Sequence, residues 1–139
     1  VEVMGGTTLA KDVVLSSLAA GKHVVTANKA LVAEELPLLQ TTLASAANSN
    51  LNKGNNTPQL GFEAAVCGGI PIISTLQSTF SRDCISEISG ICNGTTNYML
   101  CQMSSGMAYS EVLVEAQDLG FAESDPTADV EGHDVRAKI

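Results

Sequence analysis

The sequence predicts an α/β fold, and the first part of the chain carries the evidence. Residues 1–6 (VEVMGG) are a short apolar run closed by two glycines, which is typical of a buried strand running into a loop. Apolar residues at helical spacing follow over 9–18, and Gly21 stands where a helix would end. Residues 22–27 (KHVVTA) predict a second strand. A strand, a helix and a strand within about thirty residues make a βαβ unit, and such units build parallel sheets.

The next segments extend this alternation. Residues 30–47 are rich in Ala, Leu and Glu and predict a helix, which we expect to kink or break at Pro37. The Asn- and Gly-rich run 48–58 predicts a surface loop. Residues 59–66 (QLGFEAAV) predict another strand, and a helix with Pro71 near its start follows it.

The second half of the chain has a different character. Residues 83–92 (DCISEISGIC) alternate loosely and predict a strand with one covered face. Residues 93–103 begin with turn and capping residues and predict a helix. Ser110 is placed to cap a further helix that Gly120 ends. After a turn around a proline, residues 132–139 begin a last helix.

Composition limits the possible classes of protein. The 139 residues are 45 % hydrophobic, so the chain can build a core as one domain or as parts of two. The net charge of −8 and the pI of about 4.5 argue against nucleic acid or an anionic membrane as partner. No apolar run is long enough to span a bilayer, and no signal peptide opens the chain. Because the first residue is Val1 rather than Met, we expect an excised piece of a longer protein.

The four cysteines show neither metal-site spacing nor a disulfide framework. They are Cys67, Cys84, Cys92 and Cys101. In a chain this rich in apolar residues we expect buried free thiols and a reducing compartment.

The first candidate site is Lys29 in the segment TANKA, directly after a predicted strand. In a doubly wound sheet, ligands bind beyond the carboxyl ends of the strands, so this lysine can meet a phosphate, a carboxylate or a carbonyl. The alternative is a solvated lysine at a helix start, and spacing alone favours that alternative.

The second candidate site is the glycine pair in FEAAVCGGIPII. Gly68 and Gly69 permit unusual torsions, and successive backbone carbonyls in such a turn can bind a monovalent cation. A tight turn between a strand and a helix explains the pair equally well. Glu63 is less ordinary, because a carboxylate inside an apolar strand needs partners or a ligand.

The third candidate site lies near the end of the chain. Asp134 and Lys138 are four residues apart and share a face of the predicted helix, and Glu123 precedes that helix. Two carboxylates and a lysine suit a small zwitterion, since the acids can hold its ammonium while the lysine meets its reacting oxygen. Spacing alone favours an ordinary surface ion pair, worth a few tenths of a kcal/mol. Calcium is a rival ligand, although the D-x-D-x-D-G loop is missing. Three more acids can be turn and cap residues: Asp125, Asp129 and Glu131.

Four segments in order, GKHVVTANKAL, FEAAVCGGIPII, ISGICNGTTNYML and LGFAESDPTADVEGHDVRAKI, resemble homoserine dehydrogenase. The resemblance runs from Val1 to Ile139 and is interrupted mainly at the Asn-rich loop. It implies the C-terminal part of a Rossmann-type NAD(P)-binding domain over residues 1–66. The N-terminal part of an α+β catalytic and dimerisation domain then covers residues 67–139.

The resemblance also implies an activity, the reversible NAD(P)-dependent reduction of L-aspartate 4-semialdehyde to L-homoserine. This reaction belongs to threonine, methionine and isoleucine biosynthesis. The resemblance further implies a small-molecule substrate, NADP or NAD as cofactor, a sodium ion, a homodimer at full length and a cytoplasmic or plastid location. Residues 1–139 alone are expected to be inactive. Two alternatives stay open: another α/β oxidoreductase of amino-acid metabolism, and a non-catalytic remnant that dimerises or binds a partner.

The resemblance assigns cofactor and metal roles to several positions. Thr7 and Lys29 match residues near the nicotinamide and its ribose, and Gly120 matches a cofactor-contacting glycine. Four positions match those that hold sodium, largely through backbone carbonyls: Glu63, Val66, Gly68 and Ile70. The choice between NAD and NADP stays open.

The resemblance assigns the substrate to the end of the chain. Glu123 and Asp134 match the acids that bind the ammonium of the amino acid, and Lys138 matches the proposed proton donor. A lysine ammonium can stabilise the charge on the carbonyl oxygen and supply its proton. Lys29 is the other candidate donor, and we expect Lys138 to act.

Overall fold

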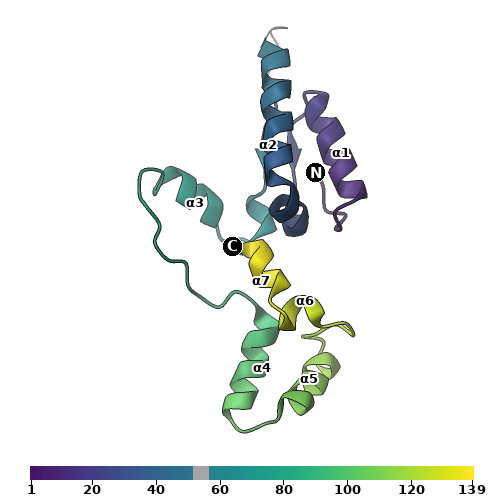
Figure 1. The fold of residues 1–139 in the computed structure, drawn as a ribbon, viewed down its shortest axis with the longest axis vertical. Coiled ribbons are helices and arrows are strands. Elements are labelled where there is room, and N and C mark those ends of the chain that lie inside the picture. Colours follow the sequence, from purple (N-terminus) through teal and green to yellow (C-terminus); the bar gives the residue numbers. More distant parts are fainter. Residues whose placement is uncertain (52–56) are drawn as a thin grey trace. The chain divides into compact units, whose positions relative to one another are not determined.

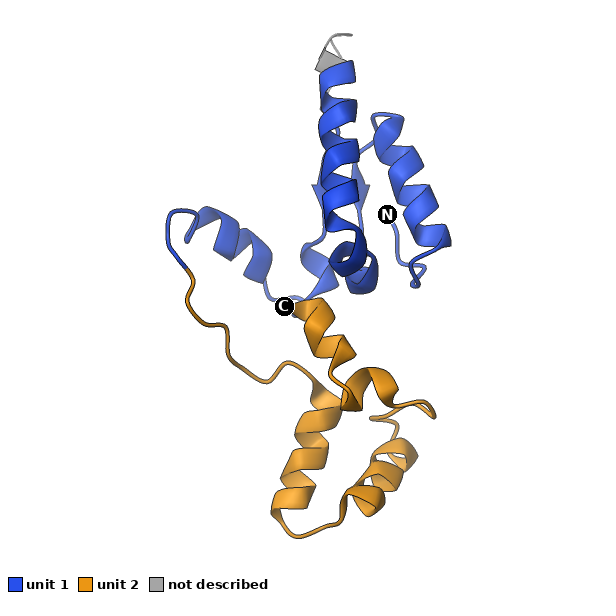
Figure 2. Cartoon of the chain, in the orientation of Figure 1, with its two compact units in different colours: residues 1–84 blue, residues 85–139 orange. Residues whose placement is uncertain are grey.

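The computed structural model describes residues 1–51 and 57–139, with the side chains of residues 50 and 51 left out of the description. These residues form two compact units, residues 1–84 and residues 85–139 (Figure 2). The expectation of a loop over residues 52–56 lies outside the described residues. Within the described residues, no helix combines the length and the apolar character needed to cross a membrane.

The first unit contains the predicted βαβ arrangement (Figure 1). Its elements are α1 (Leu9–Ala19), β1 (Val24–Val25), α2 (Lys29–Leu51), β2 (Leu60–Gly61), η1 (Glu63–Ala65) and α3 (Ile72–Ser78). Strands β1 and β2 pair in parallel, with α2 as the crossover between them. Glu2 adds a parallel bridge to Thr26, with α1 as the crossover. The prediction of parallel pairing through helices is therefore confirmed.

The core of the first unit forms where α1 packs on α2. Ala10, Val14 and Leu18 are buried and spaced by four, so they lie on one face of α1. Leu31 and Leu39 of α2 are fully buried against this face. Gly21 ends α1 as predicted, with φ of 76° and its N–H donating to the carbonyl of Leu18.

The second unit consists of short helices around a small core. Its helices are α4 (Gly94–Ser104), α5 (Tyr109–Asp118), α6 (Thr127–Val130) and α7 (His133–Lys138). Met99 of α4 and Val112 and Ala116 of α5 are buried together with Ala122. This packing fixes the start of α4 near the chain that leads into α6 and α7, since α4 contacts both α5 and α6.

The long second helix continues over residues 48–51, where a loop was expected, so that expectation is wrong. Of the kink or break expected at Pro37, the break is absent, because α2 runs through this residue. Pro37 leaves the carbonyl of Ala33 without its helical donor, but both residues are exposed, so water can solvate that carbonyl. Helix α2 therefore tolerates the proline.

Two strand predictions also need correction. The strand expected over 59–66 is limited to Leu60–Gly61, and Glu63 begins the short 3-10 helix η1. Residues 83–92 form no strand, and residues 83–91 are exposed. A loosely alternating pattern makes a strand only when another strand supplies its hydrogen bonds, and no strand within the described residues pairs with this segment.

The end of the chain and the cysteines bring further corrections. Helix α5 begins at Tyr109 after Ala108, so Ser110 is not its cap; the carboxylate of Glu111 instead accepts the N–H of Ala108 at 3.3 Å. The predicted turn at residues 125–129 runs into α6.

All four cysteines are free as expected, but three are exposed and Cys92 is half-buried, so the expectation of buried thiols is wrong.

Candidate functional site

The first candidate site lies at the carboxyl end of β1. A cavity of about 280 Å³ opens there, lined by Val3, Gly5, Ala27, Asn28, Lys29 and Ala30. Lys29 is the first residue of α2 and is half-buried. The predicted placement of this lysine just after a strand end is therefore observed.

The glycine loop on one side of this cavity has an unusual backbone. Gly5 and Gly6 have φ of 76° and 69°, the left-handed region that favours glycine. A Cβ added at either residue would meet nothing within 4 Å, so backbone torsion rather than lack of space requires glycine here. Thr7 follows the loop, two residues before α1 begins at Leu9, and is half-buried. The loop backbone is thus open to a ligand.

A buried carboxylate supports this loop. Glu2 is 4 % exposed; its Oε1 accepts the N–H of Met4 at 2.7 Å, and its Oε2 accepts the hydroxyl of Thr26. Burial alone would raise the pKa of Glu2, but the hydrogen bonds from Thr26 and from the amide of Met4 outweigh it and hold the pKa below its usual value. Glu2 thus keeps a negative charge beneath the loop.

Asn28 connects the glycine loop to the helix that begins at Lys29. Its Nδ2 donates to the carbonyl of Gly6 at 2.7 Å, while its Oδ1 accepts the N–H of Leu31 at 3.1 Å and so caps α2. The backbone N–H of Asn28 donates to Thr26 Oγ1 at 3.0 Å. The signal in the sequence for this network is Glu2, a charged residue within the apolar run VEV, which the strand prediction for residues 1–6 left unexplained.

The segment expected to hold a cation has a distinctive turn. Cys67 and Gly68 are both left-handed, with φ of 57° and 58°. Glu63 Oε1 accepts the N–H of Ile73 at 2.9 Å, and Oε2 accepts that of Ser74 at 2.8 Å. Burial raises the pKa of Glu63, yet these amide donors at the start of α3 bring it below its usual value. The partners that this carboxylate needed are therefore backbone amides.

Backbone carbonyls in the same turn are partly engaged. The carbonyl of Cys67 accepts the N–H of Ile70 at 3.1 Å, and the carbonyl of Ile70 accepts the N–H of Ile72 at 2.9 Å. Each carbonyl oxygen keeps a second lone pair. Among residues 1–51 and 57–139, no three His, Cys, Asp or Glu side chains gather closely enough to hold a metal ion.

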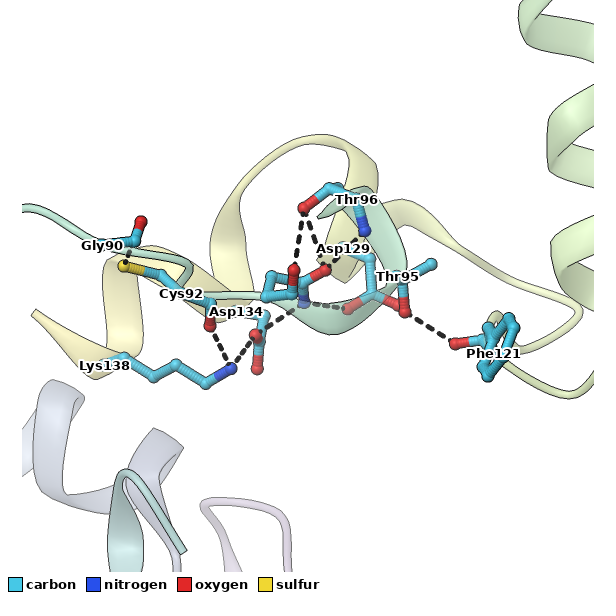
Figure 3. A network of polar contacts seen from close by, with 9 residues as sticks. Gly90, Cys92, Thr95, Thr96, Phe121, Asp129, Asp134 and Lys138 are labelled. Carbon is cyan, nitrogen blue, oxygen red and sulfur yellow. Dashed lines mark hydrogen bonds and ion pairs between the residues drawn. The ribbon is translucent and has the colours of Figure 1, made fainter. Parts of the chain in front are cut away.

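The third candidate site is in the second unit, around Lys138 (Figure 3). Its Nζ donates to Asp134 Oδ2 at 2.6 Å and to the carbonyl of Cys92 at 2.6 Å. The side chains of Lys138 and Asp134 are 27 % and 12 % exposed. The predicted pairing on one face of α7 is confirmed, and the lysine is held from two sides.

Asn93, which precedes α4, completes this network. Its Nδ2 donates to Asp129 Oδ1 at 2.7 Å and to Asp134 Oδ2 at 2.8 Å. Its Oδ1 accepts the N–H of Thr96 at 2.9 Å, which caps α4. Asn93 is 7 % exposed. In the sequence this residue was only part of a turn and cap pattern, and its distance of 41 residues from Asp134 concealed the contact.

Gly120 and the remaining acids near the end of the chain differ in the contacts that they make. Gly120 follows α5 with φ of 76°. Glu123 is exposed and takes part through its carbonyl, which accepts Gln117 Nε2 at 3.1 Å. Asp125 Oδ1 accepts the N–H of Thr127 at 3.1 Å, and hydrogen bonds from the hydroxyl and amide of Thr127 lower the pKa of Asp125. Asp125 is thus the turn residue that was expected, whereas Asp129 belongs to the Lys138 network.

Comparisons with known proteins match both parts of the chain. A family model described as homoserine dehydrogenase, NAD binding domain, covers residues 1–53, and one described as homoserine dehydrogenase covers residues 71–139. The chain belongs to the homoserine dehydrogenase family. The NAD-binding match also confirms the α/β class that the βαβ pattern predicted.

Individual members of the homoserine dehydrogenase family agree with this assignment. The enzyme of Corynebacterium glutamicum is 50 % identical over 139 residues, which are 99 % of this chain and 29 % of that protein. The enzyme of Bacillus subtilis is 46 % identical over 140 residues, which are 100 % of this chain and 30 % of that protein. The chain thus spans about 30 % of the length of these relatives.

Solved homoserine dehydrogenases share the fold. The crystal structure from Thiobacillus denitrificans has a TM-score of 0.84 at 42 % identity and covers 97 % of this chain and 29 % of its own. A hyperthermophilic archaeal homoserine dehydrogenase in complex with NADPH has a TM-score of 0.74 at 27 % identity. It covers 96 % of this chain and 39 % of its own.

Proposed function

We propose that the protein carrying this chain is a homoserine dehydrogenase that reversibly reduces L-aspartate 4-semialdehyde to L-homoserine with NADPH or NADH. The observation that carries the proposal is the Lys138 network. It places an ammonium donor 2.6 Å from a largely buried aspartate, in a chain whose two parts both match this family. The proposal includes a place in threonine, methionine and isoleucine biosynthesis.

The cofactor belongs, in this proposal, at the carboxyl end of β1. The cavity there has the left-handed Gly5–Gly6 loop on one side and Lys29 on another, which suits close approach of a dinucleotide to the backbone. Thr7 and Gly120 are the further contacts that we propose. When bound, the reduced nicotinamide supplies a hydride to the aldehyde carbon. The NADPH complex of the archaeal relative supports a nicotinamide cofactor.

Lys138 is the proposed proton donor. Negative charge grows on the carbonyl oxygen as the aldehyde is reduced, and an ammonium close to that oxygen stabilises the charge and delivers a proton. Asp134 aims Lys138, because its Oδ2 accepts the Nζ hydrogen bond. Asp134 and Glu123 are the proposed partners of the substrate ammonium. Lys29 is the alternative donor.

A sodium ion is a further proposal, held by Glu63, Val66, Gly68 and Ile70. The consecutive left-handed residues Cys67 and Gly68 turn successive carbonyls in unusual directions, which supports a carbonyl cage. Glu63 already satisfies two amides, but its oxygens have lone pairs left for a cation.

We also propose the domain division at residues 1–66 and 67–139, a homodimer at full length and a cytoplasmic or plastid location. The segment 83–92 supports a partner surface, since Ile85, Ile88 and Ile91 are 49 %, 57 % and 79 % exposed. Exposed apolar side chains gathered on one segment are typical of a surface that another part of an assembly covers.

A chimaera tests the activity. The 139 residues replace the segment that they match in the Corynebacterium glutamicum enzyme, and homoserine-dependent reduction of NAD(P)⁺ is measured beside the parent enzyme. We expect the chimaera to turn over homoserine. A soluble chimaera that binds NADPH but shows no homoserine-dependent turnover, next to an active parent, would contradict the proposal.

Lys138→Ala tests the role of the lysine in the same chimaera. In the assayed direction the group that protonates the aldehyde oxygen takes the proton back from homoserine, so its loss lowers kcat by about 10²–10⁴-fold, while NADPH binding is expected to survive. Lys22→Ala, which removes an exposed lysine before β1, is the matched control. Equal kcat in the Lys138→Ala and Lys22→Ala chimaeras would reject this role for Lys138.

A further inference from the structure

We propose that Asn93 is a positioning residue that orients the Asp134 carboxylate and, through it, the ammonium of Lys138. The inference rests on the proposed function only for the use of Lys138 as proton donor. Figure 3 shows the chain of contacts that carries it, from the start of α4 through Asp134 to the end of α7.

The geometry gives Asn93 a specific task. One nitrogen, Nδ2, uses its two N–H groups for two different carboxylates, Asp129 at 2.7 Å and Asp134 at 2.8 Å. On Asp134, the same oxygen that receives Asn93 also receives Lys138 at 2.6 Å. The position of that oxygen, together with the carbonyl of Cys92, therefore sets where Lys138 Nζ lies.

The chemistry of an amide suits this task better than a charged donor would. An amide is neutral, so it donates to two carboxylates without placing a positive charge beside either. A lysine or arginine at position 93 would instead compete with Lys138 for the same oxygen. Asn93 is only 7 % exposed, and this burial strengthens its hydrogen bonds and restricts its side chain.

Asn93 also caps α4, and the two roles can be separated by mutation. The cap uses Oδ1, which accepts the N–H of Thr96 at 2.9 Å and its hydroxyl at 3.0 Å. Aspartate is as good an N-cap as asparagine and has nearly the same shape. Asn93→Asp therefore keeps the cap and removes both donors.

The central experiment compares Asn93→Asp with wild type in the chimaera, by steady-state kinetics over a range of pH. Near pH 7 the new carboxylate repels both Asp129 and Asp134, and the misplaced lysine lowers kcat by about 100-fold. A proton shared between the carboxylate at position 93 and either neighbour raises the pKa of that pair and restores a hydrogen bond. The variant is therefore expected to regain kcat as pH falls, with its optimum moved toward acid, and a purely structural role would not produce this shift.

Two further variants separate positioning from simple stabilisation. Asn97→Asp adds the same charge on the exposed side of α4 and is expected to keep the wild-type kcat and pH profile. The exchange Asn93→Asp with Asp129→Asn restores the hydrogen bond between positions 93 and 129 with donor and acceptor reversed. It does not restore a donor to Asp134, so we expect any lost thermal stability to return and kcat to stay low.

An activity-independent measurement completes the test. The rate at which an amine-acylating reagent labels Lys138, followed by peptide mass spectrometry, is expected to rise in Asn93→Asp and to stay constant in Asn97→Asp. Wild-type kcat, pH profile and labelling in Asn93→Asp, or full recovery of kcat in the exchange variant, would overturn the inference. If Asn93→Asp does not fold, the exchange variant decides. If wild type shows no homoserine turnover, the proposed function fails, and the labelling rates still decide whether Asn93 holds Lys138.

Discussion

The buried carboxylate of Glu2 leads to a prediction about the glycine loop beside β1. Glu2→Gln changes one oxygen into an NH₂ group and leaves the size of the side chain almost unchanged. The remaining oxygen can still accept the N–H of Met4, but the nitrogen cannot accept the hydroxyl of Thr26. The variant therefore loses one hydrogen bond to an ionised acceptor in a site that is 4 % exposed.

The expected cost follows from that single bond. A hydrogen bond to a charged group contributes about 1.5–3 kcal/mol, so we expect the opening free energy of this region to fall by about 2 kcal/mol at pH 7. Since each 1.4 kcal/mol corresponds to a factor of ten, amide exchange should accelerate about 30-fold.

The sign of the pH dependence is also determined. The pKa of Glu2 is lowered on folding from 4.5, so its contribution to stability is present above that pH and is lost as pH falls through the folded value. The glutamine variant does not titrate there. The difference between wild type and Glu2→Gln should thus be largest near neutral pH and shrink below pH 4.5.

Hydrogen–deuterium exchange on peptides that cover residues 1–31 of the chimaera measures this difference. Glu34→Gln, which changes an exposed glutamate on α2, is the matched control and should exchange like wild type. Equal exchange rates in Glu2→Gln and Glu34→Gln at pH 7 would refute the reasoning, and so would a difference that grows toward acid pH.

Two further changes probe the first unit. Leu18→Ala removes a fully buried side chain from the contact between α1 and α2 and should cost about 2–5 kcal/mol, seen as faster exchange in both helices; unchanged exchange would contradict the core assignment. Pro37→Ala restores a helical N–H at an exposed position of α2 and should stabilise that helix by about 2 kcal/mol. Slower exchange over residues 33–41 is the expected result, and faster exchange would indicate that Pro37 makes a packing contact.

Local sequence patterns predicted most helices, because the interactions that start, stabilise and end a helix join residues that are close in the sequence. The spacing of apolar residues in α1, the glycine at its end and the asparagine before α4 each act within a few residues. The strand over 83–92 was predicted wrongly for the opposite reason. A strand depends on a partner elsewhere, and alternation of side chains does not supply one.

The same distinction divides the candidate site. Asp134 and Lys138 were predicted to meet because they lie four residues apart on one helix. Asn93 was missed because it reaches Asp134 across 41 residues, and Glu2 was missed because Thr26 lies 24 residues away. Glu123 was expected beside Lys138, yet it is exposed and bonded through its backbone carbonyl.

The sequence by itself determined the α/β class, the parallel pairing through helices, the family and the ion pair on the last helix. All of these depend on short-range spacing or on motifs within one segment. Only the tertiary structure decided which buried polar groups support the two sites. Those contacts join residues from different elements, and their geometry is set by how α1 packs on α2 and how α4 packs near α6.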